Sequence, residues 1–281
     1  AATRVTQVCA SPTCDSVMDR VLHDDLGAAV EVARVRRVVS LVPSLTESVA
    51  ATAEGLLVGA TAWCSHPADL EVVRVRGTKN PDVETIVALA PDLVLANVEE
   101  NREEDVAALR AAGVPVWVTD VRTVPGALTS LARMLAACGL DRPTWLDEAA
   151  AAWQDPAATS SPGSSRPRVA VPIWRRPWMV VGRDTFAGDV LARIGIDNVF
   201  ADADERYPRV EVAQMRRRGL DAVVLPDEPY PFTAKDGPEA FAPLPCALVG
   251  GRELTWYGPS LVSARDVLVE ALAGVLGDGG A

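Results

Sequence analysis

The hydrophobic pattern is most regular between Thr123 and Gln154, in the middle of the chain. Apolar residues recur there with helical spacing, at Val124, Leu128, Leu131, Leu135 and Cys138. This spacing is typical of a helix with one buried face. Gly139 and Pro143 interrupt that helix, and an Ala-rich run over 144–154 predicts a second one. We therefore expect two consecutive helices that connect the two halves of the chain.

Before these helices, short β-branched runs alternate with helical patterns. The predicted strands are Val35–Val42, Leu57–Ala60, Asp92–Ala96 and Val114–Val118. The predicted helices are Leu45–Ala53, Val83–Ala90 and Glu103–Ala112. Ser44 and Glu47 have the capping-box spacing, so we expect Ser44 to be the N-cap of the first helix. A small hairpin is expected within Val21–Ala33, and a long loop over Trp63–Pro81.

The same alternation resumes after the connecting helices. The predicted strands are Arg168–Val171, Ala222–Leu225 and Ala247–Val249, the predicted helices are Thr185–Ile194, Val212–Arg218 and Ser260–Val275, and a loop is expected over Trp174–Trp178. Alternating strands and helices predict parallel sheets with crossover helices. The pattern Pro-x-Val-Glu, followed by a helix and a strand, begins at Pro81 and again at Pro208. This echo suggests that both halves share one architecture.

The predicted fold class is α/β, with two lobes built on parallel sheets, joined by connecting helices, and a ligand cleft between the lobes. The expected divisions are residues 1–34 as an N-terminal arm and hairpin, 35–122 as the N-terminal lobe, 123–155 as the connecting helices, 156–167 as a linker and 168–281 as the C-terminal lobe. The linker is expected because the sequence there is rich in Pro, Gly and Ser.

Composition narrows the classes of function. The 281 residues are 49% hydrophobic and carry a formal net charge of −11, which argues against a nucleic-acid partner and an anionic membrane surface. No apolar run approaches the roughly 20 residues of a membrane span. The sequence has no glycine-rich phosphate loop and no nucleophile-elbow motif. We therefore expect a binding protein, not an enzyme, with no required cofactor, and a monomer.

Histidine and cysteine are scarce. Two histidines, His23 and His66, are too few for a multi-histidine metal site. The odd number of cysteines leaves at least one free thiol, while Cys9 and Cys14 are candidates for a disulfide in an oxidising compartment. The first residues lack the apolar segment of a signal peptide, so either a leader has been removed or the protein is cytoplasmic.

Candidate ligand-binding residues lie in the loops after the predicted strands. In doubly wound sheets, ligands bind outside the carboxyl ends of the strands. Aromatic residues gather in these loops although they make up only 5% of the chain, and rings interspersed with arginine suit a large, flat, partly anionic ligand. The alternative for any single ring is packing of its loop against the sheet. The expected set is Ser44, Leu45, Trp63, His66, Asn97, Asn101, Trp174, Arg175, Arg176, Trp178, Tyr230, Trp256 and Tyr257. Cys64 or His66 is a candidate axial ligand to cobalt or iron; the alternative is an ordinary loop residue.

Three runs, Arg37–Glu47, Gly77–Asp82 and Ile86–Leu95, resemble the periplasmic-binding-protein family of cobalamin and iron–siderophore uptake. The resemblance covers about residues 35–275. Within the family, the sequence looks most like the cobalamin-binding branch, the helical-backbone metal receptors. It implies two Rossmann-like lobes joined by a rigid helix and a corrinoid or other metal chelate, such as a ferric siderophore or haem, in the cleft. It also implies delivery to an ABC transporter and an extracytoplasmic location, periplasmic or at the cell surface.

The resemblance adds residues to the expected site. It implies that Tyr207 contacts the ligand, as do Trp63 and the loop containing Trp174, and Lys79 in the second matched run joins them. It assigns transporter docking to one Glu on each lobe. Glu84 matches the first, whereas the second falls at Ala213, with Glu211 nearby. Further aromatic residues of the cobalamin branch fall opposite Thr78 and Asn97.

Three hypotheses follow from these observations. The first is a solute-binding protein for cobalamin or a related chelate that serves an ABC transporter. The second is a cytoplasmic sensor or carrier with the same fold and no transporter, for which the Ala213 position and the missing leader leave room. The third is an enzyme that processes a metal chelate.

Overall fold

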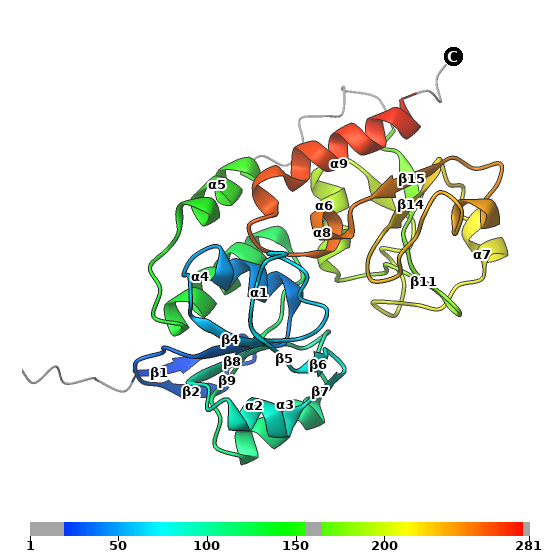
Figure 1. Cartoon of the computed structure of the whole chain (residues 1–281). Coiled ribbons are helices and arrows are strands. Elements are labelled where there is room, and N and C mark those ends of the chain that lie inside the picture. The colour runs from blue at the N-terminus through cyan, green and yellow to red at the C-terminus, as the bar shows by residue number, and fades with distance from the viewer. Residues whose placement is uncertain (1–19, 155–164, 278–281) are drawn as a thin grey trace, which may run out of the picture.

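The computed structural model describes residues 20–154 and 165–277, which form two α/β lobes connected by helices (Figure 1). The elements of the first half are β1 (Arg20–His23), β2 (Ala29–Val32), β3 (Val38–Ser40), α1 (Pro43–Ala50), β4 (Leu57–Ala60), β5 (Val73–Arg74), β6 (Arg76–Gly77), β7 (Asn80–Pro81), α2 (Val83–Ala88), β8 (Leu93–Asn97), α3 (Glu103–Ala111) and β9 (Val116–Thr119). No helix in the described ranges combines the length and hydrophobicity needed to cross a membrane.

A five-stranded parallel sheet forms the N-terminal lobe, in the order β5-β4-β3-β8-β9. Every residue of β3, β8 and β9 is buried. Continuous apolar runs of this kind are expected for parallel strands that are covered on both faces. The strands and helices that the sequence predicts in this half are therefore confirmed, apart from shifts at their ends.

The predicted hairpin near the N-terminus is also confirmed as β1 and β2. Asp24 stabilises its turn, because its Oδ1 accepts hydrogen bonds from the backbone N–H groups of Leu26 and Ala28 at 3.0 and 2.9 Å. Asp25 pairs with Arg133 at 2.8 Å, and Arg133 belongs to the first connecting helix. The hairpin is thus held against the lobe by charged contacts.

Two segments predicted as loops contain strands. Within Trp63–Pro81, β5 extends the main sheet, and β6 pairs with β7. Both residues of β5 are exposed, so no alternation of apolar and polar positions marks it. Within Trp174–Trp178, β11 (Pro172–Arg175) and β12 (Trp178–Val180) form an antiparallel hairpin. These strands are too short for a pattern to be recognised.

The predicted cap of α1 is wrong. The helix begins at Pro43, and Val42 occupies the N-cap position without a side-chain hydrogen bond. Proline at the first helical position needs no partner for an N–H group and already has a helical φ. Ser44 is instead buried inside the helix, and Glu47 pairs with Arg252 of the other lobe.

The two connecting helices appear as predicted, as α4 (Val124–Ala137) and α5 (Thr144–Ala152). Gly139 follows α4 with φ +76°, a conformation that favours glycine, and Pro143 is the N-cap of α5. The C-terminal helix also contacts the second connecting helix. The indole N–H of Trp153 donates to the carbonyl oxygen of Leu261 at 2.8 Å, so the long helix α9 (Leu261–Leu276) packs along α5 (Figure 1).

The C-terminal lobe repeats the strand order of the first. Its further elements are β10 (Arg168–Ala170), α6 (Phe186–Arg193), β13 (Asp197–Asn198), α7 (Val212–Arg216), β14 (Ala222–Pro226), the short 3-10 helix η1 (Pro238–Ala240), β15 (Cys246–Val249) and α8 (Gly251–Thr255). The parallel sheet has the order β13-β10-β14-β15, and the matching strands of the first sheet have the order β4-β3-β8-β9. In both, the strands taken in chain order lie second, first, third, fourth. The echo in the sequence therefore reflects a shared architecture.

One hydrophobic core extends through both lobes. It includes Leu95 beneath the first sheet, Leu131 in α4, Phe186 in α6 and Leu261 in α9. Two smaller clusters cover the opposite faces of the two sheets. Because α4, α6 and α9 share the common cluster, relative motion of the lobes would disturb close packing, and we expect that motion to be small.

Candidate functional site

The lobes meet at the loops that follow the carboxyl ends of their strands. Glu99, after β8, accepts a hydrogen bond from the Tyr207 hydroxyl at 2.8 Å and pairs with Arg206. Glu47 of α1 pairs with Arg252 of α8. Polar side chains therefore bridge the two lobes directly.

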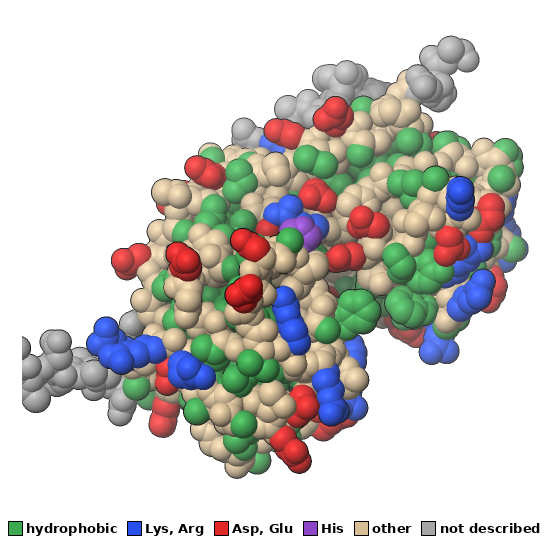
Figure 2. Space-filling model, viewed as in Figure 1, with side chains coloured by type: hydrophobic (Ala, Val, Ile, Leu, Met, Phe, Trp, Pro, Cys, Tyr) green, Lys and Arg blue, Asp and Glu red, His purple; other side chains and the backbone are tan. Residues whose placement is uncertain are grey.

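A ring contact adds to these bridges. The imidazole of His66, after β4, lies edge-on to the Trp256 indole, with ring centroids 5.5 Å apart. Figure 2 shows hydrophobic side chains at the surface where the two lobes approach each other. The interlobe region thus has both polar and aromatic components.

Two tryptophans stand out by their exposure. The side chain of Trp63 is 68% exposed and that of Trp174 is 43% exposed, and among the described residues they are the only aromatic side chains in the set of exposed large hydrophobic residues. Trp63 follows β4 in the N-terminal lobe, and Trp174 lies in β11, which follows β10 in the C-terminal lobe. Each lobe therefore presents one indole near the carboxyl ends of its strands.

Trp174 begins a ladder of rings that runs into the C-terminal lobe. Successive ring centroids are 5.6 Å apart from Trp174 to Tyr230, 4.6 Å to Phe232, 5.9 Å to Trp178 and 5.3 Å to Phe241. These distances are those of favourable aromatic pairs. Trp178 is half-buried within the ladder, while Phe241 is fully buried. The exposed indole thus packs against a series of aromatic rings that reaches the core of the lobe.

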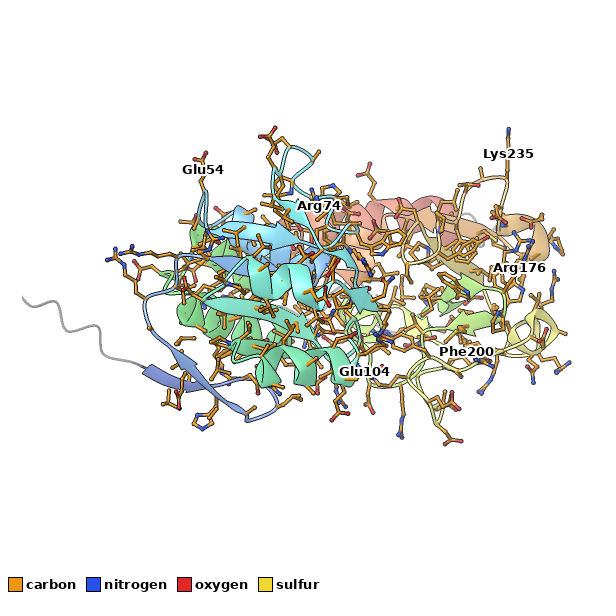
Figure 3. All side chains as sticks on the ribbon, turned by 60° about the horizontal axis from the view of Figure 1, so that its bottom comes forward. Glu54, Arg74, Glu104, Arg176, Phe200 and Lys235 are labelled. Atoms are coloured by element: carbon orange, nitrogen blue, oxygen red, sulfur yellow. The ribbon has the colours of Figure 1, made fainter. Side chains whose placement is uncertain are left out.

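The two arginines of this hairpin differ. Arg175 lies over the Trp178 ring, with its guanidinium carbon 5.5 Å from the centroid, and it pairs with Asp236 and Glu239. The backbone N–H of Gly237, together with Arg175, lowers the pKa of Glu239. Arg176 is exposed and lies toward the end of the lobe remote from the N-terminal lobe (Figure 3). Arg175 is therefore engaged in holding the ladder.

Several expected ligand residues point into the protein. Trp256 is 6% exposed, and its indole N–H donates to Glu228 Oε2 at 2.9 Å. Tyr257 is 7% exposed and packs edge-on against Phe186 at 5.6 Å; burial raises the pKa of its hydroxyl. Ser44 and Leu45 are buried as well. These residues form the junction between the lobes, and their contact with a ligand stays a prediction.

Asn97 and Asn101 shape the loop after β8. The Asn97 amide donates to the Thr119 carbonyl oxygen at 2.9 Å and accepts from the backbone N–H of Glu99 at 2.8 Å. Asn101 accepts from the backbone N–H of Asn97 at 2.9 Å and donates to the carbonyl oxygen of Thr78 at 3.0 Å. Both asparagines are buried, and their hydrogen bonds hold the loop that carries Glu99 and its neighbour Glu100.

That loop brings acidic groups into the interlobe region. Burial raises the pKa of Glu100, the carboxylates of Glu99 and Glu228 raise it further, and Lys79 opposes the shift. Burial also raises the pKa of Glu228, against the hydrogen bond from Trp256. Lys79 donates to the backbone carbonyl oxygen of Glu99. Glu100 and Glu228 stand in loops that the sequence marks, but the sequence does not predict that both acids become buried on folding.

Of the two candidate axial ligands, Cys64 does not fit that role. Its side chain is 1% exposed and lies 3.0 Å from Thr46 Oγ1 and 3.2 Å from Thr61 Oγ1. Burial raises the pKa of the thiol, so the thiolate form that binds metals is disfavoured. His66 is exposed and open to a ligand, with Ser65 Oγ 3.2 Å from its Nδ1. Within residues 20–154 and 165–277, no group of three or more His, Cys, Asp or Glu is placed to hold a metal ion. Cys9 and Cys14 lie outside these ranges.

The expected docking residues lie on the surface. Glu84 is exposed in the first turn of α2, and Glu211 is exposed as the N-cap of α7, where it forms a capping box with Gln214. Ala213, two residues on, is the second helical residue of α7, just as Glu84 is of α2. The two lobes therefore differ at this position.

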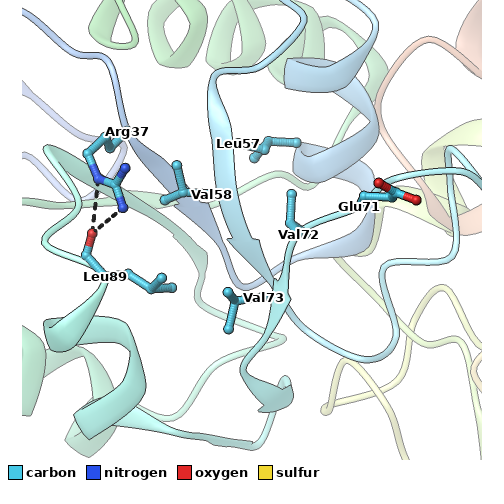
Figure 4. Close-up of a pocket in the computed structure, with 7 residues that line it drawn as sticks. All are labelled: Arg37, Leu57, Val58, Glu71, Val72, Val73 and Leu89. Atoms are coloured by element: carbon cyan, nitrogen blue, oxygen red, sulfur yellow. Dashed lines mark hydrogen bonds between the residues drawn. The ribbon is translucent and has the colours of Figure 1, made fainter.

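Two cavities lie away from the expected site. One of about 570 Å³ lies at the outer edge of the first sheet (Figure 4), lined by Arg37, Leu57, Val58, Glu71, Val72, Val73 and Leu89. Another of about 320 Å³ lies beside α6 and β13. Neither includes a residue of the expected site. In this structure, the bridging side chains bring the lobes into contact at the expected cleft.

Comparison with known proteins supports the two-lobed fold. A vitamin B12-binding protein of Salmonella typhi is 30% identical over 192 residues, covering 67% of this chain and 71% of that protein. One from Pectobacterium carotovorum is 26% identical over 201 residues, covering 69% and 72%. A periplasmic haem-binding protein solved with two haems has the same fold, with a TM-score of 0.69 and 23% identity over 85% of this chain and 98% of that one.

The family assignment rests on the sequence. The model of a family described as periplasmic binding protein matches residues 38–228, which include β3 of the first sheet and β14 of the second. That family is one of binding proteins, which is the class of protein that the sequence predicts. From the span of this match and the similarity to the Salmonella protein, we conclude that the chain belongs to the periplasmic binding protein family.

Proposed function

We propose that this protein binds a large, flat metal chelate of the corrinoid or porphyrin class between its lobes and delivers it to an ABC transporter. The observation that carries the proposal is the pair of exposed indoles, Trp63 on one lobe and Trp174 on the other. Leaving a tryptophan in water forgoes the stabilisation that its burial would give. A ligand that covers both rings would account for this exposure.

The size and shape of the ligand follow from the same rings. An indole offers a broad apolar face, and one exposed indole on each lobe suits a planar macrocycle better than a small hydrophilic solute. The relatives that bind vitamin B12 or haem handle ligands of this shape. His66, exposed beside Trp256, is the remaining candidate for an axial ligand.

The direct test is a ligand screen by equilibrium dialysis, with cyanocobalamin, haemin and a ferric siderophore as probes. The proposal predicts that at least one planar chelate binds with a Kd of about 1 µM or tighter. If none of the probes binds with a Kd below about 100 µM, the proposal is overturned. Absorbance of the freshly purified protein between 350 and 550 nm, roughly the range of corrinoid and porphyrin bands, would reveal ligand carried through purification.

We propose that Glu84 provides the main docking contact with the transporter and that Glu211 provides a secondary one. We also propose that the protein acts as a monomer outside the cytoplasm. Glu84 is exposed in the first helical turn, whereas Ala213 occupies the equivalent place in α7. The experiment is stimulation of the ATPase of the reconstituted transporter. Glu84→Lys should abolish stimulation, Glu211→Lys should weaken it, and equal effects would contradict the ranking.

A carrier that serves no transporter is the second candidate. Ala213 favours it, because one of the two expected acidic docking residues is replaced by a small apolar one. Fractionation of the native host cells distinguishes the two. Recovery in the cytoplasmic fraction supports the carrier, and recovery outside the cytoplasm supports delivery to a transporter.

A further inference from the structure

The bridge that Glu99 forms with Tyr207 and Arg206 connects the parts of the two lobes that hold the exposed indoles. Glu99 lies in the loop after β8, and Arg206 and Tyr207 lie between β13 and α7. The Tyr207 hydroxyl donates to Glu99 Oε2 at 2.8 Å, and Arg206 pairs with the same carboxylate. On each lobe, further contacts tie this bridge to one indole, that of Trp63 or that of Trp174.

In the N-terminal lobe, the connection runs through the hairpin β6–β7. The backbone N–H of Ala62 donates to a carbonyl oxygen of β6 at 2.7 Å. The indole of the next residue, Trp63, lies so close to Gly77 in β6 that a Cβ there would be 3.2 Å from the indole nitrogen. At the turn of the same hairpin, Lys79 donates to the backbone carbonyl oxygen of Glu99. The Trp63 ring and the Glu99 loop therefore contact one hairpin.

In the C-terminal lobe, the connection runs through the hairpin β11–β12. The backbone N–H of Val180, in β12, donates to the carbonyl oxygen of Pro208 at 3.1 Å. The carbonyl oxygen of Arg206 accepts from the backbone N–H two residues beyond β12 at 2.7 Å. The segment that carries Tyr207 is thus bonded on both sides to β12 and its extension, and β12 pairs with β11, which carries Trp174.

This bridge is more accessible than the other charged bridge between the lobes. The side chains of Glu99 and Arg206 are each 24% exposed. In the other bridge, Glu47 is buried in α1 when it pairs with Arg252. Of the two, the bridge at Glu99 is therefore the one that solvent and an entering ligand can reach.

We propose that the contact of Glu99 with Tyr207 and Arg206 is a latch, which holds the hairpins β6–β7 and β11–β12 together in the absence of ligand and opens when the ligand enters. This inference rests on the proposed function, because it assumes that the ligand lies between Trp63 and Trp174. When a ligand binds only the open form, its apparent affinity is reduced in proportion to the fraction of the protein that is open. Weakening the latch should therefore strengthen binding.

The variant Tyr207→Phe removes the hydroxyl of the latch and keeps the ring. Its binding of cyanocobalamin and of haemin can be followed by the quenching of tryptophan fluorescence after rapid mixing. For a probe that binds, we expect the association rate constant, and with it the affinity, to rise about fivefold, and the dissociation rate constant to stay unchanged. Glu99→Gln, which removes the charge that both partners contact, should act in the same direction.

Glu104→Gln is the matched control for the loss of a carboxylate. Glu104 lies in the same lobe, in α3, with 69% of its side chain exposed and a surface pair to Arg102 at 3.2 Å. Its replacement should leave both rate constants unchanged.

Two results would overturn the latch and leave the proposed function standing. Faster dissociation and weaker binding in Tyr207→Phe would assign the hydroxyl to ligand contact. An unchanged association rate constant in both Tyr207→Phe and Glu99→Gln would show that the bridge does not limit entry. Absence of binding of both probes to the native protein would overturn the latch and the proposed function together.

Discussion

The hydroxyl of Tyr207 donates a hydrogen bond to Glu99 Oε2 at 2.8 Å, and this contact joins the two lobes. Glu99 also pairs with Arg206, so a single carboxylate binds the side chains of two adjacent residues of the opposite lobe. Burial and the Glu99 charge raise the pKa of the Tyr207 hydroxyl, which keeps it protonated as the donor. The resemblance assigns Tyr207 to the ligand, whereas here it bridges the lobes.

Replacing Tyr207 with Phe tests this bridge. The change removes one hydrogen bond to a charged acceptor and leaves the Glu99–Arg206 pair in place. We expect the free energy of unfolding to fall by about 1 kcal/mol, measured by urea denaturation. The comparison is Glu104→Gln, whose surface pair should contribute less than about 0.5 kcal/mol. Equal stability of Tyr207→Phe and the native protein would show that the contact is not maintained in solution.

The second bridge is more deeply buried. Glu47 is 6% exposed and pairs with Arg252. Arg252→Met would leave the carboxylate buried without its partner, with an expected loss of about 3 kcal/mol in the free energy of unfolding. Adding Glu47→Gln removes the stranded charge and should recover part of that loss. If the double variant is less stable than Arg252→Met alone, the buried charge is not the cause.

Stability should depend on pH through Glu100. A carboxyl whose pKa is higher in the folded than in the unfolded protein binds more protons when folded, so raising the pH destabilises the fold. Because burial raises the pKa of Glu100 above 4.5, this loss develops as the pH rises above that value. Glu100→Gln should therefore have a higher Tm than the native protein at about pH 8, and the difference should shrink toward about pH 4. A difference independent of pH would contradict this assignment.

The regular elements could be predicted because their signals are local. Apolar spacing identified α4, and Gly139 marked its end. The signal failed where the decisive contacts are distant in sequence. Ser44 and Glu47 have the capping-box spacing, but Pro43 starts the helix and Glu47 turns to Arg252, which is 205 residues away.

The candidate site could be predicted only as a set of loops. Sequence position places Asn97, Trp256 and Trp63 alike after strands, yet the first two are buried and the third is exposed. Burial depends on how the lobes pack, and no local pattern encodes it. The same applies to Glu100 and Glu228, because burial in the folded protein raises the pKa of each carboxyl.

The central claim is that one ligand contacts Trp63 and Trp174 together. The most direct measurement is the Kd of the best chelate for Trp63→Ala, for Trp174→Ala and for the variant with both changes. Trp145→Phe, in the connecting helix α5, is the control. We predict a loss of about tenfold for each single variant, a larger loss for the double variant and no change for the control. Unchanged affinity in the double variant, with the fold intact, would show that the ligand does not lie between these two rings.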